Sequence, residues 1–159
     1  MRKVILARID GRLIHGQVVT SWLHVTNANL IYCVDDALPK DALLQRILKA
    51  TTPPGCGLKC FDTTGAIEAI KQEPEPNERL MVITKNPMPY EAFVDAGIEL
   101  ERVVIGSMGA EPGRKKYERT LAATDEEIAC FKRIIEKGVP VELQSLPDQA
   151  PISFDRIVK

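Results

Sequence analysis

The residues best suited to chemistry lie in one short segment near the N-terminus. It reads Arg-Ile-Asp-Gly-Arg-Leu-Ile-His-Gly-Gln and spans residues 8–17. Within it, His15 follows two arginines, Arg8 and Arg12, and one carboxylate, Asp10. Neutral imidazole is a nucleophile, and its unperturbed pKa of about 6.5 leaves neutral ring available at cytosolic pH. The two guanidinium groups would stabilise a dianionic phosphoryl group attached to that ring.

Other residues of the segment suit the same chemistry. Gly11 and Gly16 allow the backbone to approach a ligand closely, and the N–H groups at the start of a helix attract anions. Asp10 can accept a hydrogen bond from the ring or orient an arginine. Phosphoryl transfer depends mainly on positioning and charge stabilisation. Local composition is therefore coherent with a phosphohistidine at His15, although a histidine among arginines is more often a solvated surface residue.

A strand is expected before this segment and a helix after it. Apolar, β-branched runs predict strands at residues 3–9, 30–34, 57–61, 80–83 and 103–105. Amphipathic spacing predicts helices around residues 18–25, 39–48, 64–72, 89–97 and 124–138. The run 139–144 alternates in polarity and holds a proline, which is typical of an edge or terminal strand. This order predicts a three-layer α/β fold with a mainly parallel central sheet and helices on both faces, in which the last strand or strands can form an antiparallel edge.

Length and composition favour one domain over residues 1–159. Hydrophobic residues make up 45% of the chain and charged residues 27%, which argues against a disordered protein. The net charge of −1 argues against a nucleic-acid binder. No apolar run approaches the roughly 20 residues of a membrane helix, and the N-terminal run is too short for a signal peptide. The four cysteines show no zinc spacing, so we expect reduced thiols and no metal.

In an open parallel sheet, ligands bind beyond the carboxyl ends of the strands. We therefore expect the chemistry in the loops at residues 10–16, 35–38, 84–88 and 106–113. The last of these loops lacks the lysine and hydroxyl spacing of a P-loop. The basic run that follows it, 114–116, is a solvated face or guides an acidic partner or a phosphate.

Four further residues have a structural interpretation that the sequence favours. We expect Trp22 to lie in the core and His24 to have a structural or capping role in the first helix. Asp35 and Asp36 follow the second strand, where they cap the helix that opens at Pro39 or face the site. The sequence favours the capping role.

The segment from residue 8 to residue 18 resembles the active loop of one family. This is the IIB component of the mannose/fructose/sorbose class of the phosphoenolpyruvate-dependent sugar phosphotransferase system. Its most specific part is Arg-Leu-Ile-His-Gly-Gln at residues 12–17, and the resemblance covers essentially the whole chain. Weaker similarities lie at residues 33–36, 104–106 and 138–144. Many members have a second aspartate where this chain has Gly11, so no role is carried over for that carboxylate.

The resemblance implies a phosphocarrier enzyme of sugar uptake. His15 matches the histidine that accepts a phosphoryl group from a phosphohistidine of the IIA component and passes it to a sugar bound by the membrane components IIC and IID. Arg12 matches a phosphate-stabilising residue, and the physical argument above adds Arg8 and Asp10. The phosphate-binding loop is expected to comprise Gly11, Ile14, Gly16 and Gln17.

No cofactor is implied, neither metal nor nucleotide, because the donor is a phosphoramidate of another protein. The resemblance places the chain in the cytoplasm, held at the inner face of the membrane through IIC and IID. We expect an exposed His15 on a flat, partly apolar surface with basic residues.

Two alternatives stay open. One is a non-catalytic α/β module that binds a nucleotide or small anion at the strand ends, and the other is a regulatory protein in which phosphorylated His15 is only a signal.

Overall fold

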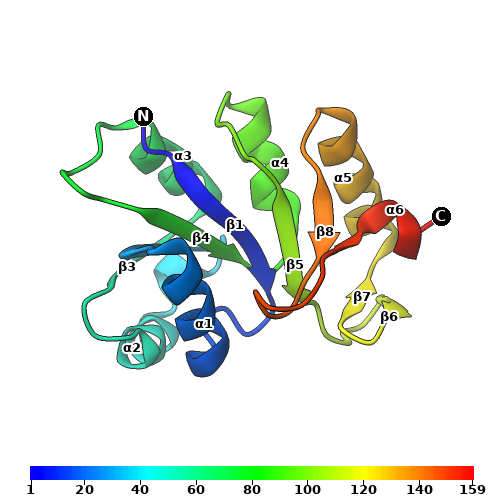
Figure 1. Cartoon of the computed structure of the whole chain (residues 1–159), viewed down its shortest axis with the longest axis horizontal. Helices are drawn as coiled ribbons and strands as arrows, with labels where there is room; N and C mark the ends of the chain where they lie inside the picture. The colour runs from blue at the N-terminus through cyan, green and yellow to red at the C-terminus, as the bar shows by residue number, and fades with distance from the viewer.

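The computed structural model describes all 159 residues, which form three layers with a seven-stranded sheet in the middle (Figure 1). The strands of this sheet, in chain order, are β1 (Val4–Asp10), β2 (Leu30–Val34), β3 (Gly57–Phe61), β4 (Leu80–Thr84), β5 (Val103–Ser107), β8 (Val141–Leu143) and β9 (Ile152–Ser153). Their spatial order is β3-β2-β4-β1-β5-β8-β9. All neighbours pair in parallel except β8 and β9, which are antiparallel. The predicted fold class is confirmed.

Helices cover both faces of the sheet (Figure 1). They are α1 (Gly16–Thr26), the short 3-10 helix η1 (Leu38–Lys40), α2 (Ala42–Thr51), α3 (Thr63–Lys71), α4 (Met88–Asp95), α5 (Asp125–Glu136) and α6 (Phe154–Ile157). The residues of α3, α4 and α5 contribute to a core cluster of 27 buried side chains. Those of α1 and α2 contribute to a second cluster of 12 on the opposite face. None of the helices is long and apolar enough to cross a membrane.

Strand β1 divides its side chains between the two clusters. Ala7 and Ile9 belong to the larger cluster, and Leu6 belongs to the smaller one beneath α1. Because side chains alternate along a strand, Arg8 and Asp10 share the α1 face with Leu6. This alternation brings a buried cation and a buried carboxylate to the side from which α1 starts.

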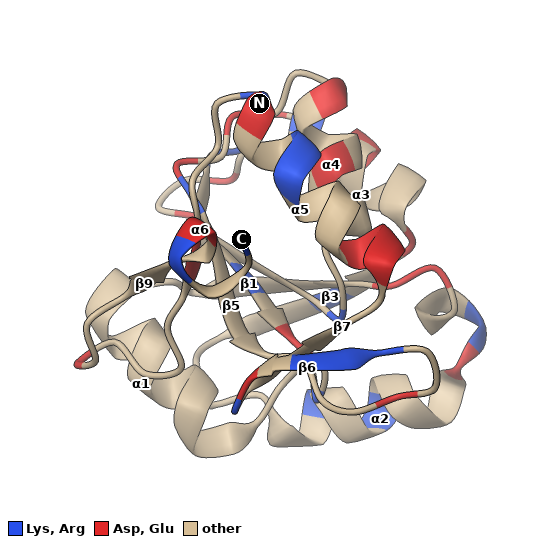
Figure 2. Cartoon of the chain, turned by 90° about the vertical axis from the view of Figure 1, so that its right-hand side faces the viewer, with Lys and Arg blue, Asp and Glu red and all other residues tan.

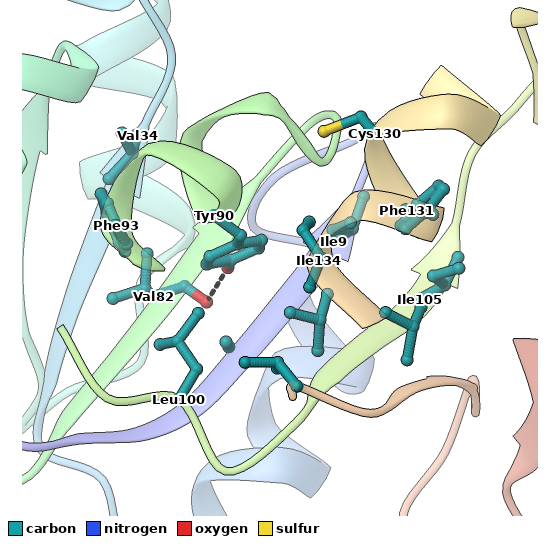
Figure 3. Close-up of a cluster of buried hydrophobic side chains, with 14 of the residues drawn as sticks. Ile9, Val34, Val82, Tyr90, Phe93, Leu100, Ile105, Cys130, Phe131 and Ile134 are labelled. Carbon is teal, nitrogen blue, oxygen red and sulfur yellow. Dashed lines mark hydrogen bonds between the residues drawn. The ribbon is translucent and has the colours of Figure 1, made fainter. Parts of the chain in front are cut away.

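A buried tyrosine ties the larger cluster to the sheet. The hydroxyl of Tyr90 lies 2.9 Å from the carbonyl oxygen of Val82 (Figure 3) and 2.7 Å from that of Arg8. It therefore links α4 to the neighbouring strands β4 and β1. Burial raises the pKa of Tyr90, and its proton is therefore retained as the donor of this link.

Most predicted elements occur close to their predicted positions. The strands at 30–34 and 57–61 match the prediction, and the helix after Thr124 begins with the expected capping box. There the Thr124 hydroxyl accepts from the Glu127 N–H at 3.0 Å, and Glu127 accepts from the Thr124 N–H at 2.9 Å. The segment 139–144 forms β8 and is not the edge, because β9 pairs along its free side.

One predicted element needs correction, and one element was not predicted. The helix expected from Pro39 is divided, because Asp41 ends η1 and caps α2 by accepting from the Leu44 N–H at 2.9 Å. The sequence also gave no sign of the hairpin of β6 (Lys115–Glu118) and β7 (Leu121–Ala123), which follows the carboxyl end of β5. β6 is mostly charged and β7 has only three residues, all apolar, so both are too short or too polar to show the period of a buried strand.

Candidate functional site

His15 occupies the junction between β1 and α1. β1 and β5 are neighbours in the sheet, and the connections that follow them run in opposite directions, from β1 toward β2 and from β5 toward β8. Their carboxyl ends therefore form a topological switch point. His15 precedes the first residue of α1 in an extended conformation, with φ −115° and ψ 111°, and its side chain caps no backbone N–H. The side chain is exposed, as predicted.

The start of α1 offers free hydrogen-bond donors beside this imidazole. The first backbone bond of the helix runs from the Val19 N–H to the His15 carbonyl, at 2.9 Å. The N–H groups of Gly16, Gln17 and Val18 therefore have no acceptor within the helix. Together with the positive end of the helix dipole, they form a site that favours an anion attached to the ring.

Three hydrogen bonds fix the loop between β1 and His15. The Gly11 N–H donates to the Ser107 carbonyl at 2.8 Å, which joins the loop to the end of β5. The Leu13 N–H donates to the Asp10 carbonyl at 2.8 Å, and the Arg12 N–H donates to Oδ1 of Asp10 at 3.0 Å. Asp10 thus closes the turn with both its backbone and its side chain.

Leu13 has an unusual backbone conformation for its residue type. Its φ is +59°, in the left-handed region, and its side chain is only 1% exposed. This conformation costs about 1–2 kcal/mol for an L-residue with a side chain. Burying a leucine contributes about 1.5–3 kcal/mol, so burial in the cluster beneath α1 outweighs the strain.

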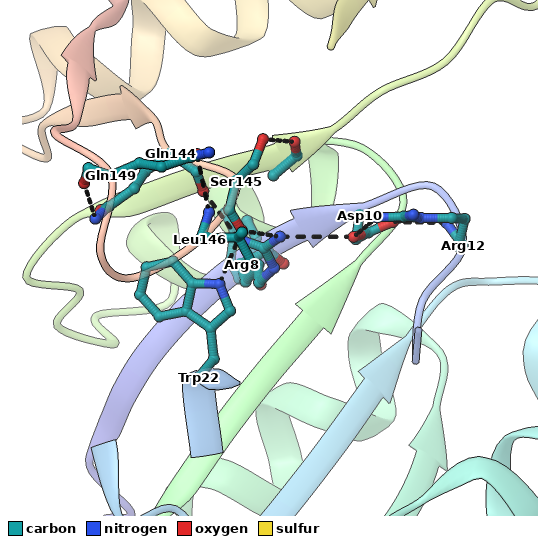
Figure 4. A network of polar contacts seen from close by, with 10 residues as sticks. Arg8, Asp10, Arg12, Trp22, Gln144, Ser145, Leu146 and Gln149 are labelled. Atoms are coloured by element: carbon teal, nitrogen blue, oxygen red, sulfur yellow. Dashed lines mark hydrogen bonds and ion pairs between the residues drawn. The ribbon is translucent and has the colours of Figure 1, made fainter. Parts of the chain in front are cut away.

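Arg12 is held by the buried carboxylate of Asp10 (Figure 4). Its Nε donates to Oδ1 and its Nη2 donates to Oδ2, each at 2.9 Å. These hydrogen bonds raise the pKa of Arg12 above its ordinary value, so the guanidinium stays charged. The arginine side chain is 47% exposed, whereas that of Asp10 is 2% exposed. One edge of the guanidinium is therefore fixed to the protein, while Nη1 on the other edge donates to no protein group.

Arg8 lies beneath the loop rather than at the surface, with 1% exposure. Nη1 donates to the Gln144 carbonyl and Nη2 to the Ser145 carbonyl, both at 3.0 Å, and Nη2 lies 3.6 Å from Oδ2 of Asp10 (Figure 4). Its guanidinium also stacks over the Trp22 ring at 5.1 Å. Burial lowers the pKa of Arg8 to about 10, which leaves it protonated at neutral pH.

The segment after β8 completes this network, and sequence reasoning missed it. The Ser145 carbonyl accepts from Arg8 and also from Nε1 of Trp22, at 3.1 Å. The Ser145 hydroxyl donates to the Gly106 carbonyl at 3.2 Å. A Cβ added to Gly106 would collide with the Arg8 guanidinium, so this position requires glycine. Trp22 lies in the core as predicted, with 2% exposure, but only the structure reveals its contact with Arg8.

The acidic pair after β2 lies outside the network of Arg8, Asp10 and Arg12. Asp35 accepts from the Ala37 N–H at 3.3 Å. Asp36 accepts from both the N–H and the hydroxyl of Thr63, at 2.9 Å each, and so holds the start of α3. The expectation that this pair caps the helix at Pro39 is therefore wrong, because Asp41 caps α2 instead. The other histidine, His24, is exposed in the last turn of α1.

The basic run 114–116 separates into two environments. Arg114 is 7% exposed and makes a two-point ion pair with Glu127, at 3.0 and 2.9 Å. Its Nη1 also donates to the Gly109 carbonyl at 2.9 Å, so it supports the loop 106–113 from inside. Lys115 and Lys116 are exposed along β6 (Figure 2). The solvated-face interpretation holds for the two lysines and is wrong for Arg114.

Comparison with known proteins gives a consistent result. Residues 4–159 match the family model described as "PTS system sorbose subfamily IIB component". The sorbose-specific EIIB component of Lacticaseibacillus casei is 32% identical over 141 residues, which cover 89% of this chain and 86% of that protein. The mannose-specific EIIAB component of Escherichia coli K12 is 30% identical over 141 residues, 89% of this chain but only 44% of that longer protein.

The fold leads to the same group of proteins. The crystal structure of the IIBSor domain of the sorbose permease from Klebsiella pneumoniae superposes with a TM-score of 0.93 at 26% identity, covering 98% of this chain and 96% of that chain. The sequence match and the shared fold agree over almost the whole length. This chain belongs to the sorbose subfamily of IIB components of the sugar phosphotransferase system.

Proposed function

We propose that residues 1–159 act as one phosphocarrier domain in sugar uptake, with His15 as the group that accepts and then donates the phosphoryl group. The observation that carries this proposal is the exposure of His15 at the start of α1, next to backbone N–H groups that have no acceptor in the helix. Membership of the IIB family supports it, because IIB components belong to a system of sugar phosphotransferases.

The transfer proceeds in two balanced steps. First, the lone pair of a neutral ring nitrogen of His15 attacks the phosphorus of a phosphohistidine on the IIA component. A P–N bond forms on His15 as the P–N bond of the donor breaks, so an imidazole and a phosphoimidazole exchange roles without net proton release. Next, a hydroxyl oxygen of the sugar attacks the phosphorus. The P–N bond of His15 breaks, and the hydroxyl proton ends on the released imidazole.

Arg12 and the loop backbone stabilise the charge during these steps. Arg12 keeps one edge of its guanidinium on Asp10 and uses Nη1 toward the phosphoryl oxygens. Asp10 acts as a positioning residue for Arg12, and Arg8 acts from below as a buried counter-charge to Asp10. The phosphate-binding loop comprises Gly11, Ile14, Gly16 and Gln17. Ile14 anchors it with a buried side chain, and the two residues at the start of α1 present backbone N–H groups.

The partners follow from this chemistry. A IIA component supplies the phosphoryl group, and a sugar held by membrane components IIC and IID receives it, which places this chain in the cytoplasm at the inner membrane face. The mannose-specific EIIAB component of Escherichia coli K12 supports a close working relation between IIA and IIB. Neither a metal nor a nucleotide takes part, because the donor P–N bond is already reactive.

A mass measurement tests the proposal. The protein is incubated with phosphoenolpyruvate, the general phosphocarriers of the system and a cognate IIA component, and its intact mass is recorded. We expect one added phosphoryl group that is labile in acid, absent in His15→Ala and retained in the matched control His24→Ala. An unchanged mass in the presence of phosphorylated IIA would overturn the proposal.

Transfer onward separates the carrier from the two alternatives. With membranes that contain matching IIC and IID, the phosphorylated protein should lose its phosphoryl group to the sugar. A phosphoryl group that stays on His15 under these conditions would favour a regulatory signal. A nucleotide or small anion retained without any covalent change would favour a non-catalytic binding module.

A further inference from the structure

We propose that Leu13 is a positioning residue of the phosphoryl-accepting loop. Its buried side chain holds the left-handed turn that directs His15 and the first N–H groups of α1 outward. The inference rests on the proposed function, since it concerns how the same loop is held ready for transfer. It assigns a role in the reaction to an apolar residue that carries no reactive group.

Leu13 is the only buried residue with a side chain in this protein that has a positive φ. Only two other non-glycine residues have a positive φ, Asn27 at +56° and Asn77 at +65°. Both are exposed asparagines, a residue type that tolerates the left-handed region. Leu13 is bulky and almost fully buried, so its conformation is imposed by its surroundings rather than preferred by its residue type.

Leu13 also lies between backbone N–H groups that bind the protein and N–H groups that have no acceptor in it. The N–H groups of Gly11, Arg12 and Leu13 itself all donate to protein oxygens. Beyond it, the N–H groups at the start of α1 have no acceptor until that of Val19. The left-handed residue therefore separates the half of the loop that binds the protein from the half that is available to a phosphoryl group.

The side chain of Leu13 is buried against α1, the helix that begins directly after His15. Its side chain lies in the cluster beneath α1, together with Val19 and Trp22 of that helix. A glycine at this position would reach the same φ without strain but would have no side chain to hold it there. Leucine thus restricts the loop to one conformation before the donor arrives, which is the condition for efficient transfer.

Three substitutions at Leu13 and one elsewhere test this role. Leu13→Ala removes the anchor and keeps the strain, whereas Leu13→Gly removes both. Leu13→Met conserves the apolar volume. Leu48→Ala is the matched control, because Leu48 is 2% exposed in the same cluster but lies in α2. Each variant is phosphorylated by the protein donor and, separately, by phosphoramidate ion, at a temperature where circular dichroism shows it folded.

The expected result is a loss of rate without a loss of donor binding. Leu13→Ala and Leu13→Gly should lower kcat about 10- to 100-fold with KM for the donor unchanged. They should also shorten the lifetime of phosphorylated His15, while Leu13→Met restores both values. Leu48→Ala should lower Tm and leave kcat and the lifetime at their wild-type values. If Leu13→Ala does not fold, Leu13→Gly carries the test because its backbone is free of strain.

Two other outcomes are distinguishable. If wild-type protein is phosphorylated and the Leu13 variants match Leu48→Ala in kcat and lifetime, the positioning role is wrong and the proposed function stands. If wild-type protein accepts no phosphoryl group from either donor, the proposed function fails, and the role of Leu13 fails with it.

Discussion

The two oxygens of Asp10 each accept a hydrogen bond from Arg12, from Nε and from Nη2, at the same distance of 2.9 Å. Such two-point contacts between a carboxylate and a guanidinium fix direction as well as distance. Asp10 is buried beside Arg8, so its carboxylate stays in one position while the Arg12 side chain extends to the surface. The exposed guanidinium is thereby pre-oriented from below, and its free edge is available to an anion at the surface.

Replacement of Arg12 should impair transfer while leaving the fold intact. Arg12→Ala is expected to slow phosphoryl acceptance by roughly 10- to 1,000-fold, because one charge-assisted contact is lost. Arg12→Lys should restore little of the rate, because a lysine ammonium cannot bind both oxygens of Asp10 and also donate a hydrogen bond to the phosphoryl group. Rapid-quench measurement of phosphorylated protein gives the rates. Arg119→Ala, at an exposed arginine of the hairpin turn, is the control and should transfer at the normal rate. An unchanged rate in Arg12→Ala removes this residue from the site.

Asp10→Asn should reduce stability more than any change at Arg12. The substitution leaves Arg8 buried without its counter-charge, and breaking a buried pair in this way costs about 3 kcal/mol or more. Urea denaturation followed by circular dichroism measures the free energy of unfolding. Asp148→Asn, at an exposed aspartate, should leave that free energy unchanged. Equal stability of the two variants would show that Arg8 does not depend on Asp10.

Two glycines of the same loop region should respond differently to alanine. A Cβ at Gly106 meets the Arg8 guanidinium, whereas a Cβ at Gly109 meets nothing within 4 Å. Gly106→Ala should therefore lower the free energy of unfolding by about 1–3 kcal/mol, as overpacking of a core does. Gly109→Ala should change it little. A thermal melt of both variants checks the contrast, and a stable Gly106→Ala would contradict the tight contact between Arg8 and the backbone.

Glu91 should make stability depend on pH in the acidic range. Hydrogen bonds from Arg133, with its charge and that of Lys137, lower the pKa of Glu91 below its ordinary value of 4.5. The folded state thus binds this proton more weakly than the unfolded state, and the contribution of Glu91 is present above pH 4.5 and lost as pH falls through the lowered pKa.

Denaturation of wild type and Glu91→Gln at several pH values tests this dependence. The wild type should be the more stable at neutral pH, and the difference should vanish in acid. The control Glu126→Gln changes an exposed glutamate of α5. Its stability relative to wild type should not depend on pH in this way. A difference between wild type and Glu91→Gln that persists below the lowered pKa would refute the assignment.

The parts of this fold that were predicted correctly are those that local sequence determines. The central strands β2 and β4 are continuous apolar runs, and the capping box at Thr124 needs only four neighbouring residues. His15 could be proposed from sequence because its segment holds the whole loop, from Arg8 to Gln17, in ten consecutive positions. Its place at the start of a helix followed from the strand before it and the amphipathic pattern after it. Its exposure was predicted from the family resemblance, because both implied partners are proteins.

The parts that were not predicted depend on contacts between distant residues. Nothing near Arg8 in the sequence indicates that its guanidinium binds carbonyls 136 and 137 positions away. A carbonyl acceptor is available at every residue, so Gln144 and Ser145 have no side-chain signature for this role. The buried pair of Arg114 and Glu127 was missed for a related reason, because the intervening hairpin has no regular pattern of polarity.

The contact between Arg8 and the segment after β8 has a consequence for biosynthesis. Arg8 leaves the ribosome before its two carbonyl acceptors, which follow 136 and 137 residues later. A partly synthesised chain therefore lacks the acceptors of both terminal nitrogens of this guanidinium, and water must solvate them until those acceptors are made. The loop at residues 10–16 thus reaches its working arrangement only after the segment that follows β8 has been translated.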